Sequence, residues 1–235
     1  MLPRLERHHD VLAPTLAGHA GGPPLGERVS HDLLADEVER AMDEAGFDTA
    51  HLVGNSLGGF VALQLAARGR ARTVVALAPA GGWPDGDSSL HERLDYFVSM
   101  QELVKAAAPH ADTILDTPEG RRRATQDTTT DFEHIPKELL VHQLLGAANC
   151  PGALELIEFA RHHGYRLEAE KIECPVRLVW GSADRLLSLP GAAVRYREQW
   201  LPRAEWIELD GIGHCPQLDV PLETAELILG VTASA

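Results

Sequence analysis

The sequence predicts an α/β fold in which a mostly parallel sheet is flanked by helices. Short apolar, β-branched runs alternate with longer amphipathic stretches, which is the pattern of repeated strand–helix units. One of these runs leads into Gly54-Asn55-Ser56-Leu57-Gly58 and then into a helical stretch, which indicates a tight strand–turn–helix junction. The middle of the chain contains helical patterns without strand runs, so we expect a helical insert within the alternating pattern.

The front of the chain, residues 1–83, alternates strand and helix. The first long helix carries an apolar stripe opposite an acidic face, and Gly46 is expected to end it as a C-cap. Short β-branched runs that end in glycine or proline give the strands. In chain order, the expected elements are a strand at 9–13, a helix at 33–45, a strand at 50–53, a helix at 59–68 and a strand at 72–77.

The rest of the chain divides into the helical insert and a second alternating stretch. We expect residues 84–168 to form a helical cap and residues 169–235 to complete the α/β core with residues 1–83. The expected cap helices are at 89–107, 121–125, 136–147 and 151–164. The expected core elements after the cap are a strand at 175–181, a helical stretch at 191–200, a strand at 204–209 and a final helix at 222–229.

Ser56 is the candidate nucleophile. A sharp turn between strand and helix strains the backbone at Ser56. We therefore expect that only small residues fit two positions before and after it, where Gly54 and Gly58 stand. The turn holds the hydroxyl at the carboxyl end of the strand, where the N–H groups of the next helix also point. A serine is nevertheless a poor nucleophile without a base that takes its proton and an acid that orients the base.

Two later residues fit these roles. Asp184 follows the apolar run at 175–181, in a loop at the carboxyl end of a strand, where open α/β sheets place their chemistry. His214 lies in a glycine-flanked loop just after the strand expected at 204–209. Three other acids follow strand runs and rank below Asp184: Asp85, Asp87 and Asp210.

With these motifs in order, the chain resembles the α/β-hydrolase superfamily from about residue 8 onward. The matching segments are residues 9–19, G-N-S-L-G-G at 54–59, W-G-S-A-D at 180–184 and G-I-G-H-C-P at 211–216. The resemblance implies that Ser56 is the nucleophile, His214 the general base and Asp184 its orienting acid. It also implies that the backbone N–H of Leu57 is one oxyanion donor, and that the helical cap covers the site.

The chain departs from the family at its front. Family members usually carry upstream strands and a His-Gly loop that supplies the second oxyanion donor, and here residues 1–7 look like the tail of the helix after that loop. We therefore expect the N-terminal strands to be missing, with a gap between the strands at 9–13 and 50–53. Two explanations stay open. Met1 is an internal residue of a longer protein whose start was misassigned, or the chain is truly short and either degenerate or rearranged.

The resemblance implies a hydrolase that acts on carboxylic esters or similar small acyl substrates. Serine in the turn disfavours dehalogenases and epoxide hydrolases, which use aspartate there. Two alternatives remain: a carbon–carbon bond hydrolase of aromatic breakdown, which the G-N-S-L-G-G form favours, and an inactive pseudo-hydrolase that binds a small ligand. Six cap residues could line an apolar acyl pocket or simply pack the helices: Leu94, Phe97, Met100, Leu139, Leu145 and Phe159.

Composition limits the classes of molecule that the protein is expected to bind. A net charge of −14 argues against nucleic acid and against an anionic membrane surface, and leaves a small-molecule substrate as the expected partner. A homodimer stays open. Three scattered cysteines do not form a disulfide framework, and Cys215 is expected to be a packing residue. No metal-ligand spacing or cofactor motif is found, and we expect a bacterial, cytoplasmic protein without metal or cofactor.

Overall fold

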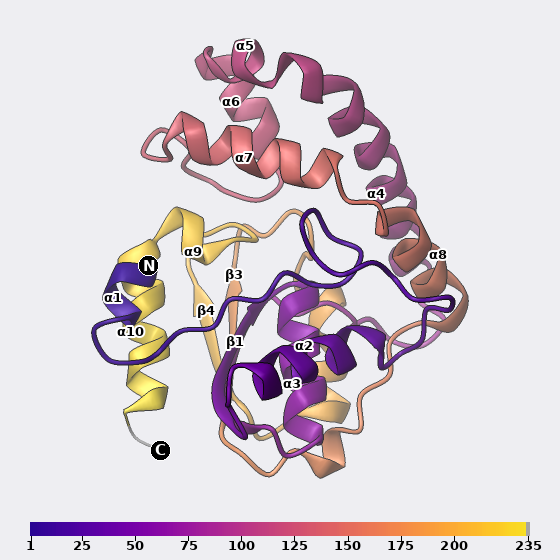
Figure 1. Ribbon diagram of the computed structural model, residues 1–235, viewed down its shortest axis with the longest axis vertical. Coiled ribbons are helices and arrows are strands. Elements are labelled where there is room, and N and C mark those ends of the chain that lie inside the picture. The colour runs from indigo at the N-terminus through magenta and orange to yellow at the C-terminus, as the bar shows by residue number, and fades with distance from the viewer. Residues whose placement is uncertain (234–235) are drawn as a thin grey trace.

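The computed structural model describes residues 1–233, and its centre is a parallel sheet of four strands in the order β1-β2-β3-β4 (Figure 1). Every strand pairing is parallel. The carboxyl ends of the strands therefore meet at one edge of the sheet, where loops can gather functional groups. The strands are β1 (Ala50–Asn55), β2 (Ala71–Leu77), β3 (Val176–Gly181) and β4 (Glu205–Leu209).

Helices cover both faces of the sheet. Val74 and Ala76 of β2 face one side, where they join a buried cluster with residues of α3 (Leu57–Ala67). Val75 and Leu77, which alternate with them, join a second cluster with residues of α10 (Pro221–Thr232). The short α1 (Leu2–Leu5) packs beside α10 (Figure 1). Because both faces of β2 are buried, its sequence is apolar without alternation, as expected for a central parallel strand.

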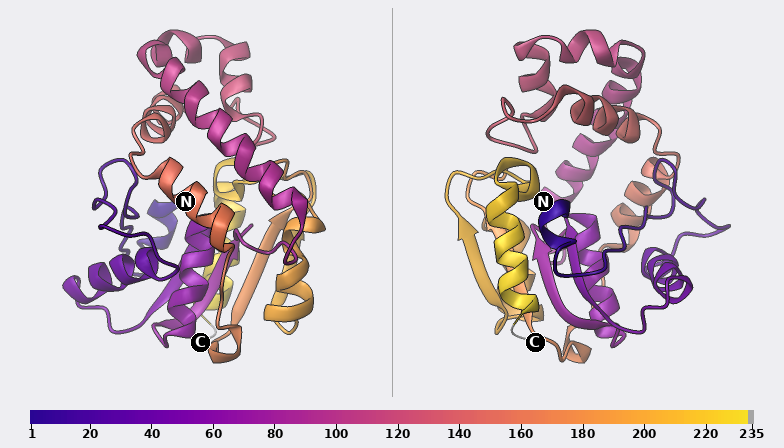
Figure 2. Two further views of the ribbon diagram at one scale, coloured as in Figure 1. Left: turned by 90° about the vertical axis from the view of Figure 1, so that its right-hand side faces the viewer. Right: turned by 60° about the vertical axis from the view of Figure 1, so that its left-hand side comes forward.

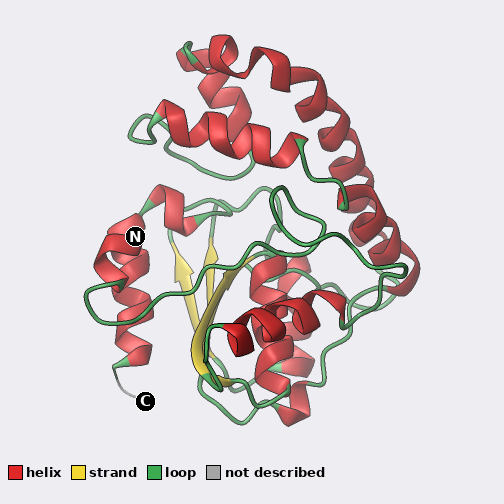
Figure 3. Cartoon of the chain, in the orientation of Figure 1, coloured by secondary structure: helices red, strands yellow, loops and turns green. Residues whose placement is uncertain are grey.

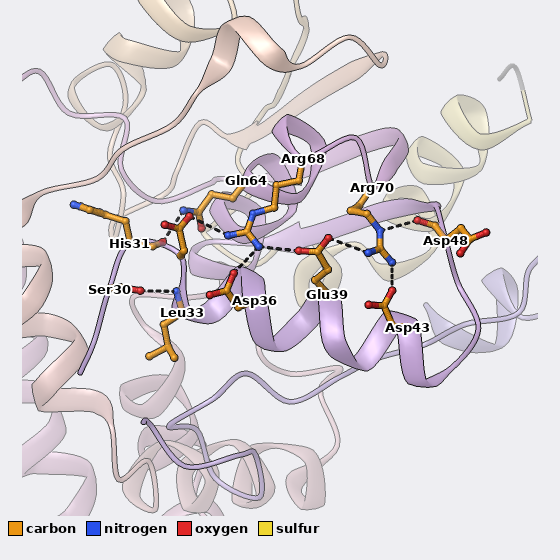
Figure 4. Close-up of polar contacts among 11 residues, drawn as sticks. Ser30, His31, Leu33, Asp36, Glu39, Asp43, Asp48, Gln64, Arg68 and Arg70 are labelled. Carbon is orange, nitrogen blue, oxygen red and sulfur yellow. Dashed lines mark hydrogen bonds and ion pairs between the residues drawn. The ribbon is translucent and has the colours of Figure 1, made fainter. Parts of the chain in front are cut away.

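Ion pairs fasten the helix α2 (Leu33–Glu44) to the connection between α3 and β2, as Figure 4 shows. Glu39 of α2 pairs with Arg68, which follows α3, and with Arg70, which precedes β2, at 2.8 and 2.9 Å. In the C-terminal half of α3, Gln64 donates to the backbone carbonyl of His31 at 2.8 Å. These contacts hold residues just before α2 against the sheet domain, near the turn that carries Ser56.

A run of helices, α4 to α8, lies in sequence between β2 and β3 and projects beyond the carboxyl edge of the sheet (Figure 2). We call residues 88–163 the helical insert. Within residues 1–233 the insert contains no strand, as Figure 3 shows by its colours. Its helices are α4 (Ser88–Ala107), a 3-10 turn (Ala108–His110), α5 (Ala111–Leu115), α6 (Pro118–Thr125), α7 (Lys137–Ala148) and α8 (Ala153–His163).

Four short elements lie around the last two strands. Residues 191–200, expected as one helical stretch, are helical throughout: the 3-10 turn Gly191–Ala193 continues through Val194 and Arg195 into the π-helical turn Tyr196–Trp200. The N–H of Arg195 donates to the carbonyl of Gly82 at 2.8 Å. The short elements are the turns Ala169–Lys171, Gly191–Ala193 and Tyr196–Trp200, and the helix α9 (Pro216–Asp219).

The strand expected at 9–13 is wrong. This segment has no regular secondary structure, and the ring of His9 instead contacts His51 and the hydroxyl of Thr232. Val11 and Leu12 are about two-fifths exposed, so the segment is not held against the sheet by burial of these side chains. In the described residues β1 is therefore an edge strand, and Val53 on it is 39% exposed.

Candidate active site

Ser56 occupies a strained turn between the end of β1 and the start of α3. Its φ of 54° and ψ of −119° lie in a region that non-glycine residues rarely adopt. A Cβ at Gly54 would lie 2.2 Å from the carbonyl of Gly58, so only glycine fits at position 54. The expected requirement for a small residue at Gly58 is wrong, because a Cβ there meets open space; Gly59 is the crowded position, 2.9 Å from the Gly54 carbonyl oxygen.

Backbone hydrogen bonds hold Ser56 in this conformation. Its N–H donates to Leu77 at 2.9 Å, and its carbonyl accepts from Ala80 at 3.0 Å. Both partners belong to the end of β2 and the loop after it, so the turn is fixed to the central strand. Leu57 is the first residue of α3, and its N–H consequently has no intrahelical acceptor and remains available to a ligand at the turn.

Asp184 and His214 form a buried, hydrogen-bonded pair. The carboxylate Oδ2 of Asp184 lies 2.8 Å from Nδ1 of His214, and the two residues are only 4% and 2% exposed. The other oxygen, Oδ1, accepts the N–H groups of Leu186 and Leu187 at 2.8 and 2.7 Å. Because Oδ1 is occupied, Asp184 presents Oδ2 to the imidazole and occupies its Nδ1 atom. Nε2 is therefore the ring nitrogen that is left to exchange a proton.

The Nε2 atom of His214 is buried and makes no hydrogen bond within residues 1–233. No hydrogen bond joins it to the Ser56 hydroxyl in this part of the chain, although Asn55, the residue before Ser56, is bonded to the backbone of His214. A buried, unpartnered nitrogen is unusual in a folded protein and is typical of a group that meets its partner during a reaction.

Asn55 connects the serine turn to the His214 loop. Its Nδ2 donates to the carbonyls of Leu77 and His214, each at 3.0 Å. Its Oδ1 accepts from Gln217 at 3.1 Å and from the thiol of Cys215 at 3.3 Å. This role of Asn55 was not predicted from the sequence, although a polar residue immediately before Ser56 was an available signal.

The acids that compete with Asp184 have other partners. Asp210 contacts the hydroxyl of Ser182 at 3.3 Å. Asp85 forms an ion pair with Arg195, and Asp87 caps the N-terminus of α4. Among these acids, only Asp184 contacts His214.

A mostly apolar cavity opens beside Ser56. The sheet domain, the loop before α2 and the insert all contribute to its wall. Of the six insert residues considered for an acyl pocket, Leu94, Phe97 and Phe159 line it, whereas Met100, Leu139 and Leu145 do not. The other lining residues are Val29, Ser30, His31, Leu34, Leu57, Phe60, Gln64, Ala80, Trp83, Leu90, Leu156, Ile157, Ala160, Gly164, Tyr165 and Leu187.

Three ionisable groups in or near this cavity, those of Tyr165, His31 and Cys215, have pKa values shifted in favour of the neutral form. Burial raises the pKa of Tyr165 to about 12, so its hydroxyl stays protonated and able to donate. Burial, with the nearby charge of Arg166, lowers the pKa of His31 below its usual value. The Cys215 thiol next to His214 has its pKa raised to about 12 by burial and by the carboxylates of Asp184 and Asp219, which excludes a thiolate nucleophile at neutral pH.

His19-Ala20-Gly21-Gly22, which superficially resembles an oxyanion loop, does not reach the cavity wall. The ring of His19 contacts the carbonyl of Ala17 instead, at 3.1 Å. Within residues 1–233, no three side chains of His, Cys, Asp or Glu are grouped as metal ligands, and no helix has the length and apolar character needed to cross a bilayer.

Comparison with known proteins shows relatives along most of the chain. Residues 1–227 match the alpha/beta hydrolase family. The chain is 34% identical over 201 residues to epoxide hydrolase EphH of Mycobacterium tuberculosis, an alignment that covers 85% of this chain and 94% of that protein. It is 30% identical over 246 residues to the pimeloyl-(acyl-carrier protein) methyl ester esterase of Aromatoleum aromaticum, covering 93% of this chain and 85% of the esterase.

Among solved structures, the meta-cleavage product hydrolase CumD of Pseudomonas fluorescens IP01 is similar, with a TM-score of 0.72. The likeness covers 99% of this chain and 83% of CumD at 21% sequence identity. At that identity the likeness shows a shared fold, with the parallel sheet and flanking helices described above.

Proposed function

This chain belongs to the α/β-hydrolase family and is a hydrolase, and we propose that it is a serine hydrolase that cleaves esters of small apolar carboxylic acids. One observation carries the proposal. Among the described residues 1–233, the buried Asp184–His214 pair leaves Nε2 without a partner, and Ser56 stands in a strained turn that lines an apolar cavity. Acyl transfer requires a base held in a fixed orientation, a hydroxyl exposed at a tight turn and a site that binds the acyl group.

In the first half of the reaction, Ser56 Oγ attacks the ester carbonyl while His214 Nε2 takes the hydroxyl proton. The carbonyl oxygen becomes an oxyanion, and the N–H of Leu57 is placed to stabilise it together with the N-terminal end of α3. The intermediate collapses, the bond to the alcohol oxygen breaks, and His214 gives its proton to that oxygen. The carboxylate of Asp184, bonded to Nδ1, stabilises the imidazolium that forms in between.

In the second half, water attacks the acyl group on Ser56, and His214 accepts a proton from the water. The carboxylic acid leaves, and the proton returns to Ser56 Oγ. Asn55 keeps the His214 backbone fixed relative to the turn through both halves, because its amide holds the carbonyls of His214 and Leu77 together.

The cavity argues for a small acyl group. Its volume is about 170 Å³, close to that of a cavity that binds benzene, about 150 Å³. Its wall is predominantly apolar, and its ionisable groups His31 and Tyr165 are neutral, so a charged acyl group is disfavoured. We therefore propose acyl chains of up to about six carbons as the preferred class.

The helical insert acts as a cap in this proposal. Leu94 and Phe97 of α4 and Phe159 of α8 contribute to the wall of the cavity that Ser56 also lines. A cap of this kind excludes water from the oxyanion and selects the acyl group by shape. The core and cap boundaries proposed are 1–83 with 169–235, and 84–168.

The test is Ser56→Ala in an assay with p-nitrophenyl esters of increasing acyl length. We expect hydrolysis of the butyrate ester to fall by about 10³-fold or more, and hydrolysis of the palmitate ester to be poor even in the wild type. Ser99→Ala, which removes an exposed hydroxyl on α4, is the matched control and should keep full activity. Equal rates for Ser56→Ala and the wild type would reject Ser56 as the nucleophile.

Two other substrate classes belong in the same assay. Carbon–carbon bond hydrolysis remains an alternative because Asn55 precedes Ser56 in the G-N-S-L-G-G form and because CumD shares the fold. The name of the Mycobacterium tuberculosis relative makes an epoxide the other class to test, although the turn holds serine. Faster turnover of either class than of the esters would replace the ester proposal, and binding without any turnover would support the pseudo-hydrolase alternative.

A further inference from the structure

We propose that Asp219 is a positioning residue that fixes the His214 loop and joins it to the helical insert. The inference rests on the proposed role of His214 as general base. Asp219 ends α9, the short helix that follows the His214 loop, and it is only 8% exposed. It does not contact the imidazole, and the reaction described above does not use it.

One carboxylate bridges two segments that are far apart in the sequence. Its Oδ2 accepts the N–H of Gly213, the residue before His214, at 2.7 Å. Its Oδ1 accepts the N–H groups of Thr130 and Asp131 in the insert, at 2.9 and 3.2 Å. The hydroxyl of Thr130 also donates to Oδ2, at 3.3 Å. Asp219 therefore fastens the insert loop at 128–131 directly to the loop that carries the proposed base.

Other contacts join the same two segments, the insert and the His214 loop. The N–H of Cys215 donates to the carbonyl of Thr128 at 2.8 Å, on the other side of His214. The ring of His134 in the insert contacts the carbonyl of Leu218 at 2.7 Å. A Cβ at Gly213 would lie 3.0 Å from the Thr128 oxygen and 3.1 Å from Asp219 Oδ2, so the two loops are in close contact there.

The charge of Asp219 is balanced by oriented neutral donors. Within the described chain no lysine, arginine or histidine forms an ion pair with it. A buried carboxylate is tolerated only where its lone pairs are satisfied, and here three backbone N–H groups and one hydroxyl do so. An amide in its place would direct an NH₂ donor at one of these N–H groups, which would break the bridge on one side.

The consequence for the reaction follows from the position of Gly213. A displacement of its N–H moves the adjacent His214, and a shift of about 1 Å in a reacting group can reduce turnover by about 10²-fold. The bridge also means that the insert and His214 are displaced together. Loss of Asp219 should therefore reduce kcat more than it changes KM, because the cavity wall remains in place.

The experiment compares Asp219→Asn with Asp210→Asn, the same substitution at an exposed carboxylate of the same loop region. Two readouts are taken at a temperature well below both melting transitions: kcat and KM on p-nitrophenyl butyrate, and hydrogen exchange of the amides at 128–131 and 211–215. For Asp219→Asn we expect kcat to fall at least tenfold with KM changed less than threefold, and exchange to accelerate in both segments together. Asp210→Asn should resemble the wild type in every readout.

Wild-type kcat in a folded Asp219→Asn, or faster exchange in only one of the two segments, would overturn the proposal. If Asp219→Asn does not fold, Thr130→Val removes one donor from the insert side, and at least twofold faster exchange in both segments is then the expected result; unchanged exchange overturns the bridge. A wild type that hydrolyses no ester would refute the proposed function, whereas the exchange measurement still decides whether Asp219 joins the two loops.

Discussion

Ser56 is held in an unfavourable backbone conformation by the atoms around it. Such a conformation costs about 1–3 kcal/mol, which the bonds from Leu77 and Ala80 offset by fixing the turn to β2. The close approach of Gly54 to the Gly58 carbonyl is the second condition for the turn. The reactive position is therefore built by glycine packing and backbone hydrogen bonds, not by the serine itself.

The two glycines on either side of Ser56 should respond oppositely to alanine. Gly54→Ala places a Cβ 2.2 Å from backbone atoms and should lower the free energy of unfolding by about 3 kcal/mol or more. Gly58→Ala places a Cβ in open space within α3 and should raise it by about 0.5–1 kcal/mol. Urea denaturation of both variants measures the difference, and equal destabilisation would contradict the packing described for this turn.

At this scale, local sequence patterns identified Ser56, Asp184 and His214, each of which follows a recognisable strand end. The structure brings Asp184 and His214 into contact, and the role of Ser56 stays a prediction. The distant partners of Asn55 and Asp219 could not be predicted, because they lie more than a hundred or nearly ninety positions away in the chain. The steric requirement was assigned to Gly58 rather than Gly59 because spacing alone does not reveal which glycine meets the neighbouring loop.

Among the elements, the helices of the insert form a group that is distinct from the helices covering the sheet. Its helices contact mainly one another, with α4 packing on α7 and α8. Its own buried cluster is small and centres on Leu115, Ile135 and Leu140. A unit with a small core of this kind is expected to open locally at a lower free energy than the central strands.

Hydrogen exchange should therefore be faster at residues 88–164 than in the strands at 50–53, 73–77 and 176–180. The amides inside the insert helices are the ones to compare with the strand amides, since loop amides exchange quickly in any protein. Residues 128–131, which Asp219 holds, should be the most protected loop of the insert. Uniform protection across the insert and the sheet would contradict the proposal that the insert is a separate cap.

Strongly periodic or uniformly apolar elements could be predicted to within a few residues. The helix expected at 33–45 is Leu33–Glu44, and the strand expected at 175–181 is Val176–Gly181. The strand expected at 9–13 failed because a short run has no strand character of its own; only a neighbouring strand edge could have ordered it. Whether such an edge pairs is a tertiary property that local sequence does not contain.

For the molecule as a whole, burial of neutral histidines should make stability depend on pH. Burial, followed by the charges of His9 and Arg72, lowers the pKa of His51, and burial lowers the pKa of His31. Both groups bind protons more weakly in the folded state than in the unfolded state. Their contribution to stability is therefore present above the ordinary histidine pKa, about 6.5, and is lost as the pH falls through the folded-state values.

We expect the melting temperature to fall between pH 7.5 and pH 5.5, and the fall to be smaller in His51→Asn. The asparagine removes the titrating ring and can still bond the hydroxyl of Thr73, which contacts His51 Nδ1 at 2.9 Å. Differential scanning calorimetry at both pH values measures the change. An identical pH dependence in the variant and the wild type would show that His51 does not contribute to it.

The central claim is that His214, oriented by Asp184, activates Ser56. The most direct measurement is covalent labelling with a fluorophosphonate, read by intact mass and peptide mapping, because the label reports the activated hydroxyl whatever the natural substrate is. We expect one label per chain, on Ser56 and not on Cys215, whose thiol is protonated. Labelling should be abolished in Ser56→Ala and at least 10²-fold slower in His214→Ala. A wild type that stays unlabelled, or a Ser56→Ala variant that labels at the wild-type rate, would contradict this claim.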